Sequence, residues 1–207
     1  IMKNQSLKPL VDVRRIAVAG VLSAISIILT LVPSLGYIPI GPVAITTMHI
    51  PVIIAAILEG PFIGAFVGLI FGLSSLYTAA TIFAGLPTAF PFLNPLVSVL
   101  PRILIGIVAY YAFTGAVKLI KNKSIAYITG AVAGTLTNTI GVLGMIYILY
   151  AQKYVESLIK LDASLACKSA LVIIFGGVLL NVIAEIVMAA LLTVPVVMAV
   201  LKIKRSS

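Results

Sequence analysis

Residues 46–77 read TTMHIPVIIAAILEGPFIGAFVGLIFGLSSLY, two apolar runs joined by Glu59-Gly60-Pro61. Glycine and proline favour a tight turn at this junction, so the stretch predicts two neighbouring helices. The run from 46 to 58 is too short to cross roughly 30 Å of hydrocarbon as a helix on its own. We therefore expect the segment before it to dip into the membrane and complete the crossing.

Composition places the rest of the chain in the membrane as well. The 207 residues are 62% hydrophobic and only 9% charged, which is far more apolar than a soluble domain of this length. Because a transmembrane helix takes about 20 apolar residues, the chain can hold roughly six spans with short connections. We expect an all-α integral membrane fold in which residues 1–207 form a single six-helix transmembrane domain.

Six apolar segments supply the expected spans. They cover residues 14–32, 46–58, 62–77, 95–119, 125–151 and 169–201. Long apolar loops are predicted at 33–42 and 78–94, and a mixed-charge loop at 152–168, all on the same side of the membrane. Prolines and glycines preclude a continuous helix through the first of these loops. The last span is long enough to tilt, or to kink before Pro195.

The basic residues predict which side of the bundle faces the cytoplasm. Ten of the fourteen lysines and arginines gather near the two termini and at 118–123, on one side of a six-span arrangement. The positive-inside rule makes that side cytoplasmic, so both termini are expected there in a multi-pass protein of the cell membrane. Three lysines of the 152–168 loop fall on the opposite side, where two acidic residues accompany them. The net charge of +9 is thus interpreted as a topology signal rather than a nucleic-acid-binding surface.

Several kinds of chemistry find no support in the residues. One cysteine and one histidine provide no cluster at metal-ligand spacing. No paired carboxylates share a helical face, and no phosphate-gripping glycine loop joins a strand to a helix. We therefore expect no enzyme activity, no metal and no cofactor, and any energy for transport would come from a partner protein.

Small residues recur at every fourth position in three spans. The rows are Gly64, Gly68 and Gly72 in the third span, Ala126, Gly130 and Gly134 in the fifth, and Gly20 and Ala24 in the first. Rows of this kind allow helices to approach closely. Internal packing is the favoured interpretation for the third and fifth spans, whereas the first span leaves room for a partner subunit.

Three ionisable residues are expected inside the membrane, where charge is costly and commonly functional. Arg102 would bind either loop carbonyls or an anionic ligand, and both interpretations stay open. Glu185 is interpreted as a structural group that lies too deep to pair directly with Arg102. His49, beside Thr46 and Thr47, would either donate a hydrogen bond to a ligand or cap the start of its helix.

Further polar and aromatic side chains could line an outer cavity. Asn94 precedes Pro95 at the start of a span, so an N-cap role competes with ligand contact there. Asn181 shares a helical face with Glu185. The candidate substrate-binding residues are Thr46, His49, Tyr77, Phe90, Asn94, Arg102, Asn138 and Asn181.

Two blocks of sequence resemble a known family. Residues 46–75 and the block NPLVSVLPRILIG at 94–106 resemble the substrate-binding S components of energy-coupling factor (ECF) transporters, and the six-span layout agrees over nearly the whole chain. The resemblance implies a high-affinity vitamin-binding subunit. The blocks are most similar to pantothenate-type members, while riboflavin, folate, a pyridoxine-like vitamin and cobalamin stay open as substrates.

The resemblance also implies partners. In this family a membrane coupling subunit and two cytoplasmic ATPases energise uptake, and small residues of the first span contact the coupling subunit. Those positions correspond here to Ala17, Gly20 and Ala24, with Ala19 and Ser23 as neighbours. Gly20 and Ala24 only approximate the usual alanine-x-x-x-alanine pattern of this family.

Two other functions compete with this interpretation. A self-sufficient secondary transporter would need ion coupling, and the few carboxylates in the spans argue against it. A membrane enzyme or a purely structural protein is the remaining possibility, and a bundle without a cavity would favour structure.

Overall fold

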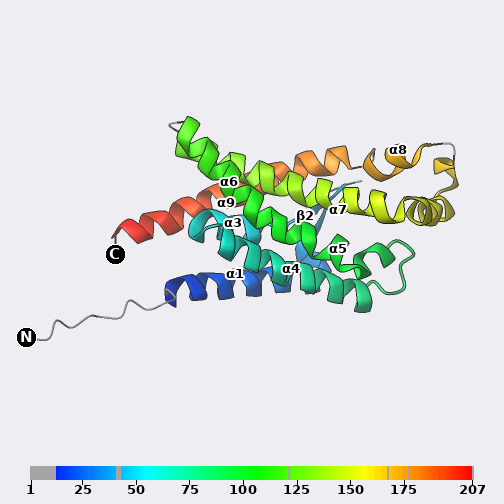
Figure 1. The fold of residues 1–207 in the computed structure, drawn as a ribbon, viewed down its shortest axis with the longest axis horizontal. Helices are drawn as coiled ribbons and strands as arrows, with labels where there is room; N and C mark the ends of the chain where they lie inside the picture. The colour runs from blue at the N-terminus through cyan, green and yellow to red at the C-terminus, as the bar shows by residue number, and fades with distance from the viewer. Residues whose placement is uncertain (1–12, 41–42, 121, 167, 177, 207) are drawn as a thin grey trace, which may run out of the picture.

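The computed structural model describes residues 13–40, 43–120, 122–166, 168–176 and 178–206, and nearly all of its regular structure is helical (Figure 1). The elements, in chain order, are α1 (Val13–Leu31), α2 (Pro33–Gly36), β1 (Tyr37–Ile40), β2 (Val43–Thr46), α3 (Ile50–Glu59), α4 (Pro61–Thr81), the 3₁₀ turn η1 (Phe90–Leu93), α5 (Pro95–Ser98), α6 (Leu100–Leu119), α7 (Lys123–Leu161), the 3₁₀ turn η2 (Ala163–Leu165), α8 (Ala170–Phe175) and α9 (Leu179–Ser206).

Five stretches of the described chain are long and apolar enough to cross a membrane. They are Val13–Leu31, Pro61–Thr81, Pro95–Leu119, Lys123–Leu161 and Ala170–Ile203. The expected second span is the exception, because α3 has 10 residues and rises only about 15 Å. The described residues therefore form a nearly all-helical membrane bundle with five candidate spans and one short central helix, which agrees with the expectation that the second segment is too short to cross on its own.

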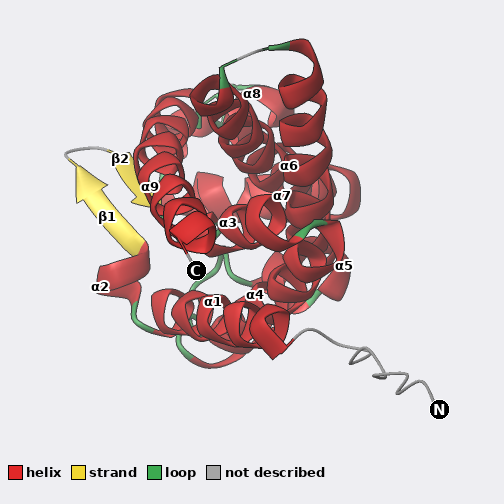
Figure 2. Ribbon diagram, turned by 90° about the vertical axis from the view of Figure 1, so that its left-hand side faces the viewer, coloured by secondary structure: helices red, strands yellow, loops and turns green. Residues whose placement is uncertain are grey.

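The segment before α3 corrects the expectation of an irregular loop. Residues 33–40 and 43–46 form the short helix α2 and an antiparallel strand pair in which Tyr37 pairs with Thr46 and Ile38 with Ile45. Branched apolar residues favour strands, and pairing satisfies backbone groups that an irregular loop would leave unbonded in an apolar setting. Figure 2 shows the hairpin beside α9, and β2 contacts that helix directly.

One predicted loop was also wrong, and two predicted spans each comprise two helices. The loop expected at 152–168 starts later, because α7 continues to Leu161 and its 39 residues extend about 58 Å. The expected fourth span, 95–119, is confirmed as a candidate span, and within it α5 and α6 meet at Val99. The expected last span is interrupted between Phe175 and Leu179, whereas α9 runs through Pro195 without ending.

Helix α3 lies at the centre of the bundle. It contacts α1, α4, α6, α7 and α9, and its residues from Ile50 to Ile57 are all buried. A helix that is apolar on every side is expected to be surrounded by protein, which explains why the shortest of the main helices occupies this place. Burial of α3 positions its preceding hairpin and its N-terminus within the bundle.

The glycine rows pack helices together, as expected for the third and fifth spans. A Cβ at Gly68 of α4 would lie 2.2 Å from the carbonyl oxygen of Arg102, and one at Gly106 would lie 2.2 Å from the backbone of Gly64. On α7, Gly134 approaches Ile53 of α3. These close approaches fix α4 against α6 at the level of Arg102.

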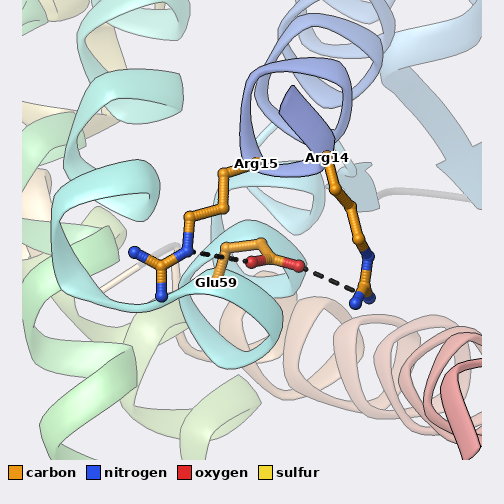
Figure 3. Close-up of polar contacts among 3 residues, drawn as sticks. All are labelled: Arg14, Arg15 and Glu59. Carbon is orange, nitrogen blue, oxygen red and sulfur yellow. Dashed lines mark ion pairs between the residues drawn. The ribbon is translucent and has the colours of Figure 1, made fainter. Parts of the chain in front are cut away.

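An ion-pair cluster marks one end of the bundle, which we call the Glu59 end. Arg14 Nη2 lies 3.6 Å from Glu59 Oε1, and Arg15 Nε lies 3.5 Å from Oε2 (Figure 3). The turn after Glu59 is made by Gly60 with φ +99°, a conformation that favours glycine. Figure 1 places the first turn of α1, the connection between α6 and α7 and the end of α9 at this same end.

Candidate functional site

A cavity of about 240 Å³ lies in the half of the bundle away from the Glu59 end, and we call it the Arg102 cavity. Its wall combines four aromatic rings, several hydroxyl groups, one amide and one cation. The lining residues are Thr30, Tyr37, Thr46, Met48, Phe71, Ser75, Thr78, Ala79, Phe83, Leu86, Thr88, Ala89, Phe92, Arg102 and Asn138.

Arg102 supplies the positive charge of the cavity from the first turn of α6. The residue is 6% exposed, and its Nη1 donates to the carbonyl oxygen of Val97 at 2.6 Å. The guanidinium carbon lies 5.4 Å from the ring centre of Phe71 and 5.8 Å from that of Phe92. Neither ion pair among the described residues involves Arg102, so its charge is available to an anion in the cavity.

Two buried polar atoms in the cavity wall have no hydrogen-bond partner within the described chain. They are Arg102 Nε, a donor, and Asn138 Oδ1, an acceptor. Buried polar groups are normally hydrogen-bonded, so unpartnered atoms on residues that line a cavity are candidate partners for a bound molecule. Chemically, Arg102 Nε would suit a hydrogen-bond acceptor such as an anion, and Asn138 Oδ1 would suit a hydrogen-bond donor.

Some hydroxyl groups of the wall donate hydrogen bonds to backbone carbonyl oxygens of their own helices. Thr30 Oγ1 donates to Ser26 O at 2.7 Å, and Thr78 Oγ1 donates to Ser74 O at 2.7 Å. Ser26 in turn donates to the carbonyl oxygen of Met48 at 3.2 Å. Helix α1 therefore contributes Thr30 to the cavity and also holds the segment that carries Met48.

The structure brings together three of the eight candidate binding residues. Thr46, Arg102 and Asn138 line the Arg102 cavity. Thr46 comes from β2, Arg102 from α6 and Asn138 from α7, so the cavity depends on contacts among distant parts of the sequence.

His49 lies outside the lining of this cavity. It is fully buried at the start of α3, and its Nε2 lies 3.0 Å from Thr135 Oγ1 of α7. Of the two alternatives for His49, side-chain capping is wrong, because His49 occupies the N-cap position of α3 but its side chain makes no cap hydrogen bond. In this structure His49 joins α3 to α7 behind the cavity wall.

The remaining candidates lie elsewhere. Tyr77 is 58% exposed on α4, and Asn181 is half-buried on α9 without a place in the cavity lining. Asn94 caps α5, because its side chain accepts from Leu96 N at 2.9 Å, and its Nδ2 also donates to Tyr150. The N-cap interpretation of Asn94 is confirmed.

Phe90 belongs to a second, apolar cavity at the same end of the bundle. Its ring packs edge-on against Tyr150 with centroids 5.5 Å apart, and Lys153 Nζ lies 4.6 Å from its centre. These contacts attach the segment around η1 to the end of α7. Because the same segment carries Phe83 and Phe92, the attachment helps to hold one wall of the Arg102 cavity in place.

Sequence reasoning missed the aromatic part of the wall. Tyr37 stands on the unforeseen hairpin, and Phe71, Phe83 and Phe92 are aromatic residues within apolar stretches that look alike in the sequence. The resemblance of the block at 94–106 pointed to the right region of α6, but nothing in it indicated which rings would face the cation.

The predicted partner-contact residues lie on an exposed face of α1. Ala17, Gly20 and Ala24 are exposed, and a Cβ at Gly20 would meet nothing within 4 Å. The neighbours Ala19 and Ser23 are buried against the bundle, so they do not belong to this face. The exposed, small-residue surface is defined here as the α1 face, made of Ala17, Gly20 and Ala24.

Comparison with known families identifies the class of protein. Residues 14–197 match the family described as "ECF transporter, substrate-specific component". This match covers most of the chain, so the protein belongs to the family of substrate-specific components of ECF transporters. It is a multi-pass membrane protein that works in transport.

Curated relatives carry a more particular name. The chain is 31% identical over 180 residues to the pantothenic acid transporter PanT of Lactococcus lactis subsp. cremoris, covering 80% of this chain and 82% of the relative. It is 38% identical over 128 residues to the pantothenate transporter PanT of Leuconostoc mesenteroides subsp. mesenteroides, covering 58% and 61%.

Proposed function

We propose that this chain binds pantothenate in the Arg102 cavity as the substrate-binding subunit of an ECF transporter. Both relatives are named for this vitamin, which carries a carboxylate, an amide and two hydroxyl groups around a dimethyl carbon. The observation that carries the proposal is a buried arginine with no ion-pair partner in the wall of a cavity. A carboxylate offers Arg102 the charged, hydrogen-bonding partner that it lacks in the described chain.

The size and lining of the cavity favour a compact vitamin. Ligand pockets commonly enclose roughly 300–1,000 Å³, and this one holds about 240 Å³. Pantothenate is much smaller than cobalamin or folate, both of which would require a larger space. The rings of Phe71 and Phe92 offer an apolar surface to the dimethyl carbon, while Asn138 and Thr46 offer polar contacts to the amide and hydroxyl groups.

Titration of the purified protein tests this assignment. We expect isothermal titration calorimetry in detergent to give one-to-one binding of pantothenate with a submicromolar Kd, since isolated S components are expected to capture their solute unaided. Riboflavin, pyridoxine, folate and cobalamin serve as controls and should bind at least about 100-fold more weakly, a difference of about 2.7 kcal/mol. Tight binding of another vitamin, or of none, would contradict the assignment.

The orientation and partners of the chain form the second part of the proposal. The Glu59 end carries the basic residues near 118–123 and the end of α9, so the positive-inside rule favours a cytoplasmic location for this end. The α1 face would then contact a membrane coupling subunit that works with two cytoplasmic ATPases. Exposed small residues support this role because they permit close helix contact within the membrane.

A bulky substitution on the α1 face separates partner binding from ligand binding. Gly20→Phe is expected to reduce co-purification with the coupling subunit at least about tenfold, because a large ring prevents close approach of a helix. Leu191→Phe on the exposed surface of α9 is the matched control and should co-purify normally. Both variants should keep the wild-type affinity for pantothenate. Normal assembly of the Gly20 variant would contradict the proposed contact.

Uptake assays distinguish the proposed S component from the alternative, a self-sufficient secondary transporter. Proteoliposomes containing the chain alone should show no pantothenate accumulation under a proton or sodium gradient. Accumulation without the coupling subunit and ATPases would instead support the alternative.

A further inference from the structure

Glu185 of α9 is a buried acid that accepts hydrogen bonds from two other elements. The residue is 6% exposed, and its Oε1 accepts from the backbone N–H of Thr46 at 3.1 Å and from the Thr46 hydroxyl. Its Oε2 accepts from Thr139 Oγ1 of α7 at 3.4 Å. Neither ion pair among the described residues includes Glu185. One carboxyl group thus joins β2, α7 and α9.

Burying an acid at this depth costs free energy, so a role in packing alone does not explain the presence of Glu185. Within a membrane bundle, ionisable side chains are rare and commonly mark functional positions. Glu185 itself is absent from the cavity lining, whereas its partner Thr46 is part of that lining. Any effect of Glu185 on a bound solute is therefore transmitted through Thr46.

The hydrogen bonds of Glu185 determine what Thr46 can offer to a solute. A threonine hydroxyl has one proton to donate and lone pairs to accept with. The Thr46 hydroxyl donates its proton to Glu185 Oε1, the same oxygen that accepts from the Thr46 backbone N–H. This arrangement needs Oε1 to be free of a proton, as it is in an ionised carboxylate or in an acid protonated on Oε2. Thr46 Oγ1 then presents lone pairs alone to the cavity.

A second acceptor supports this assignment. Asn138 Oδ1 is buried in the wall of the same cavity and has no hydrogen-bond partner within the described chain. Thr46 and Asn138 together give the wall a hydrogen-bond-accepting character, in addition to the cation of Arg102. A solute that matches this wall carries hydroxyl or N–H donors as well as an anionic group.

We propose that Glu185 is a positioning residue that fixes Thr46 as a hydrogen-bond acceptor and thereby selects solutes with a hydroxyl or N–H donor. The inference rests on the proposed function, because it takes the Arg102 cavity as the binding site. If Glu185 acts in this way, replacing it changes the preference between solutes with and without a hydroxyl or N–H donor. A residue that merely holds the fold would alter the affinity for all solutes of similar shape by the same factor.

Paired titrations with two probes test the proposal. The probes are pantothenate and its dideoxy analogue, which keeps the carboxylate and the amide but lacks both hydroxyl groups. We expect wild-type protein to prefer pantothenate by at least about 30-fold, since a site built to bond a hydroxyl group rejects solutes without it. Glu185→Ala should lower this preference at least about tenfold, because the Thr46 hydroxyl is then no longer held in the orientation that accepts from the solute. Its affinity for the dideoxy analogue should stay within about threefold of the wild-type value.

Two further variants keep the test decisive if Glu185→Ala folds poorly. Glu185→Gln retains an oxygen that accepts both Thr46 donors, so it should keep the preference within about threefold of the wild-type value. Thr46→Val should lose the preference as Glu185→Ala does, and the double variant should lose nothing further. Thermal unfolding without ligand reports any structural effect separately.

The outcomes separate this inference from the proposed function. Equal losses for both probes in Glu185→Ala, or an unchanged preference in Thr46→Val, would overturn the role of Glu185 while leaving pantothenate binding intact. Wild-type protein that binds neither probe would overturn both proposals.

Discussion

Replacing Arg102 with glutamine is expected to weaken pantothenate binding at least about 100-fold. Truncating one partner of a buried, hydrogen-bonded charge pair typically costs about 2–5 kcal/mol. The loss would be large here because Arg102 is buried and is the one cationic residue in the lining of the described cavity. Calorimetric titration of the variant in detergent measures the change in Kd directly.

An alcohol analogue of the vitamin distinguishes the two roles that the sequence left open for Arg102. Pantothenol replaces the carboxylate with a hydroxymethyl group, so it gains nothing from the guanidinium charge. If Arg102 binds the carboxylate, Arg102→Gln should change pantothenol binding by less than about threefold, a difference of about 0.65 kcal/mol. Equal losses for both compounds would show that Arg102 acts only by holding Val97 and the surrounding rings.

A methyl group at Gly68 is expected to destabilise the protein by about 3 kcal/mol and to weaken pantothenate binding. Overpacking a filled interior typically costs about 1–3 kcal/mol, and we expect a loss at the upper end because the Gly68 Cβ would meet backbone atoms. The new Cβ would lie 2.2 Å from the carbonyl oxygen of Arg102, so α4 and α6 must separate at the residue that carries the cation. Thermal unfolding followed by circular dichroism, with titration of the folded fraction, measures both effects.

Gly144→Ala is the matched control for this substitution. Gly144 lies within α7, and a Cβ there would meet nothing within 4 Å. Alanine is the better helix former by about 1 kcal/mol, so the control should be as stable as the wild-type protein or slightly more stable. A Gly68→Ala variant with wild-type stability and affinity would show that the contact between α4 and α6 can yield without cost.

The main helices were predictable because their apolar runs are long. Length and hydropathy are enough to identify the stretches at 13–31, 61–81, 95–119, 123–161 and 170–203 as candidate spans. The glycine rows likewise predicted where helices meet, since close approach requires small residues. The ends of the helices were harder to predict from the sequence. Polar residues such as Gln152 and Lys153 suggested a loop, although both are compatible with an exposed continuation of α7.

The hairpin and the aromatic wall depend on information that a single sequence does not display. Pairing of Tyr37 with Thr46 joins two apolar segments that, read separately, have the prolines and glycines of a loop. Arg102, Asn138 and Thr46 were found because polar groups stand out against apolar runs. Phe71 and Phe92 do not stand out in this way, and their place beside the guanidinium follows from the packing of α4, α6 and the segment around η1.

Helix α1 has the cavity on one side and an exposed surface on the other. Thr30 lines the cavity and Ser26 bonds to Met48, while the Arg14 and Arg15 side chains attach the opposite end of the helix to Glu59. Any tilt of α1 that follows occupation of the cavity must therefore also alter the surface formed by Ala17, Gly20 and Ala24. Thermodynamic reciprocity then requires that a protein docked on this surface change the affinity for the solute by the same factor by which the solute changes docking. If the proposed coupling subunit docks on the α1 face, solute binding and subunit docking are therefore coupled through one helix.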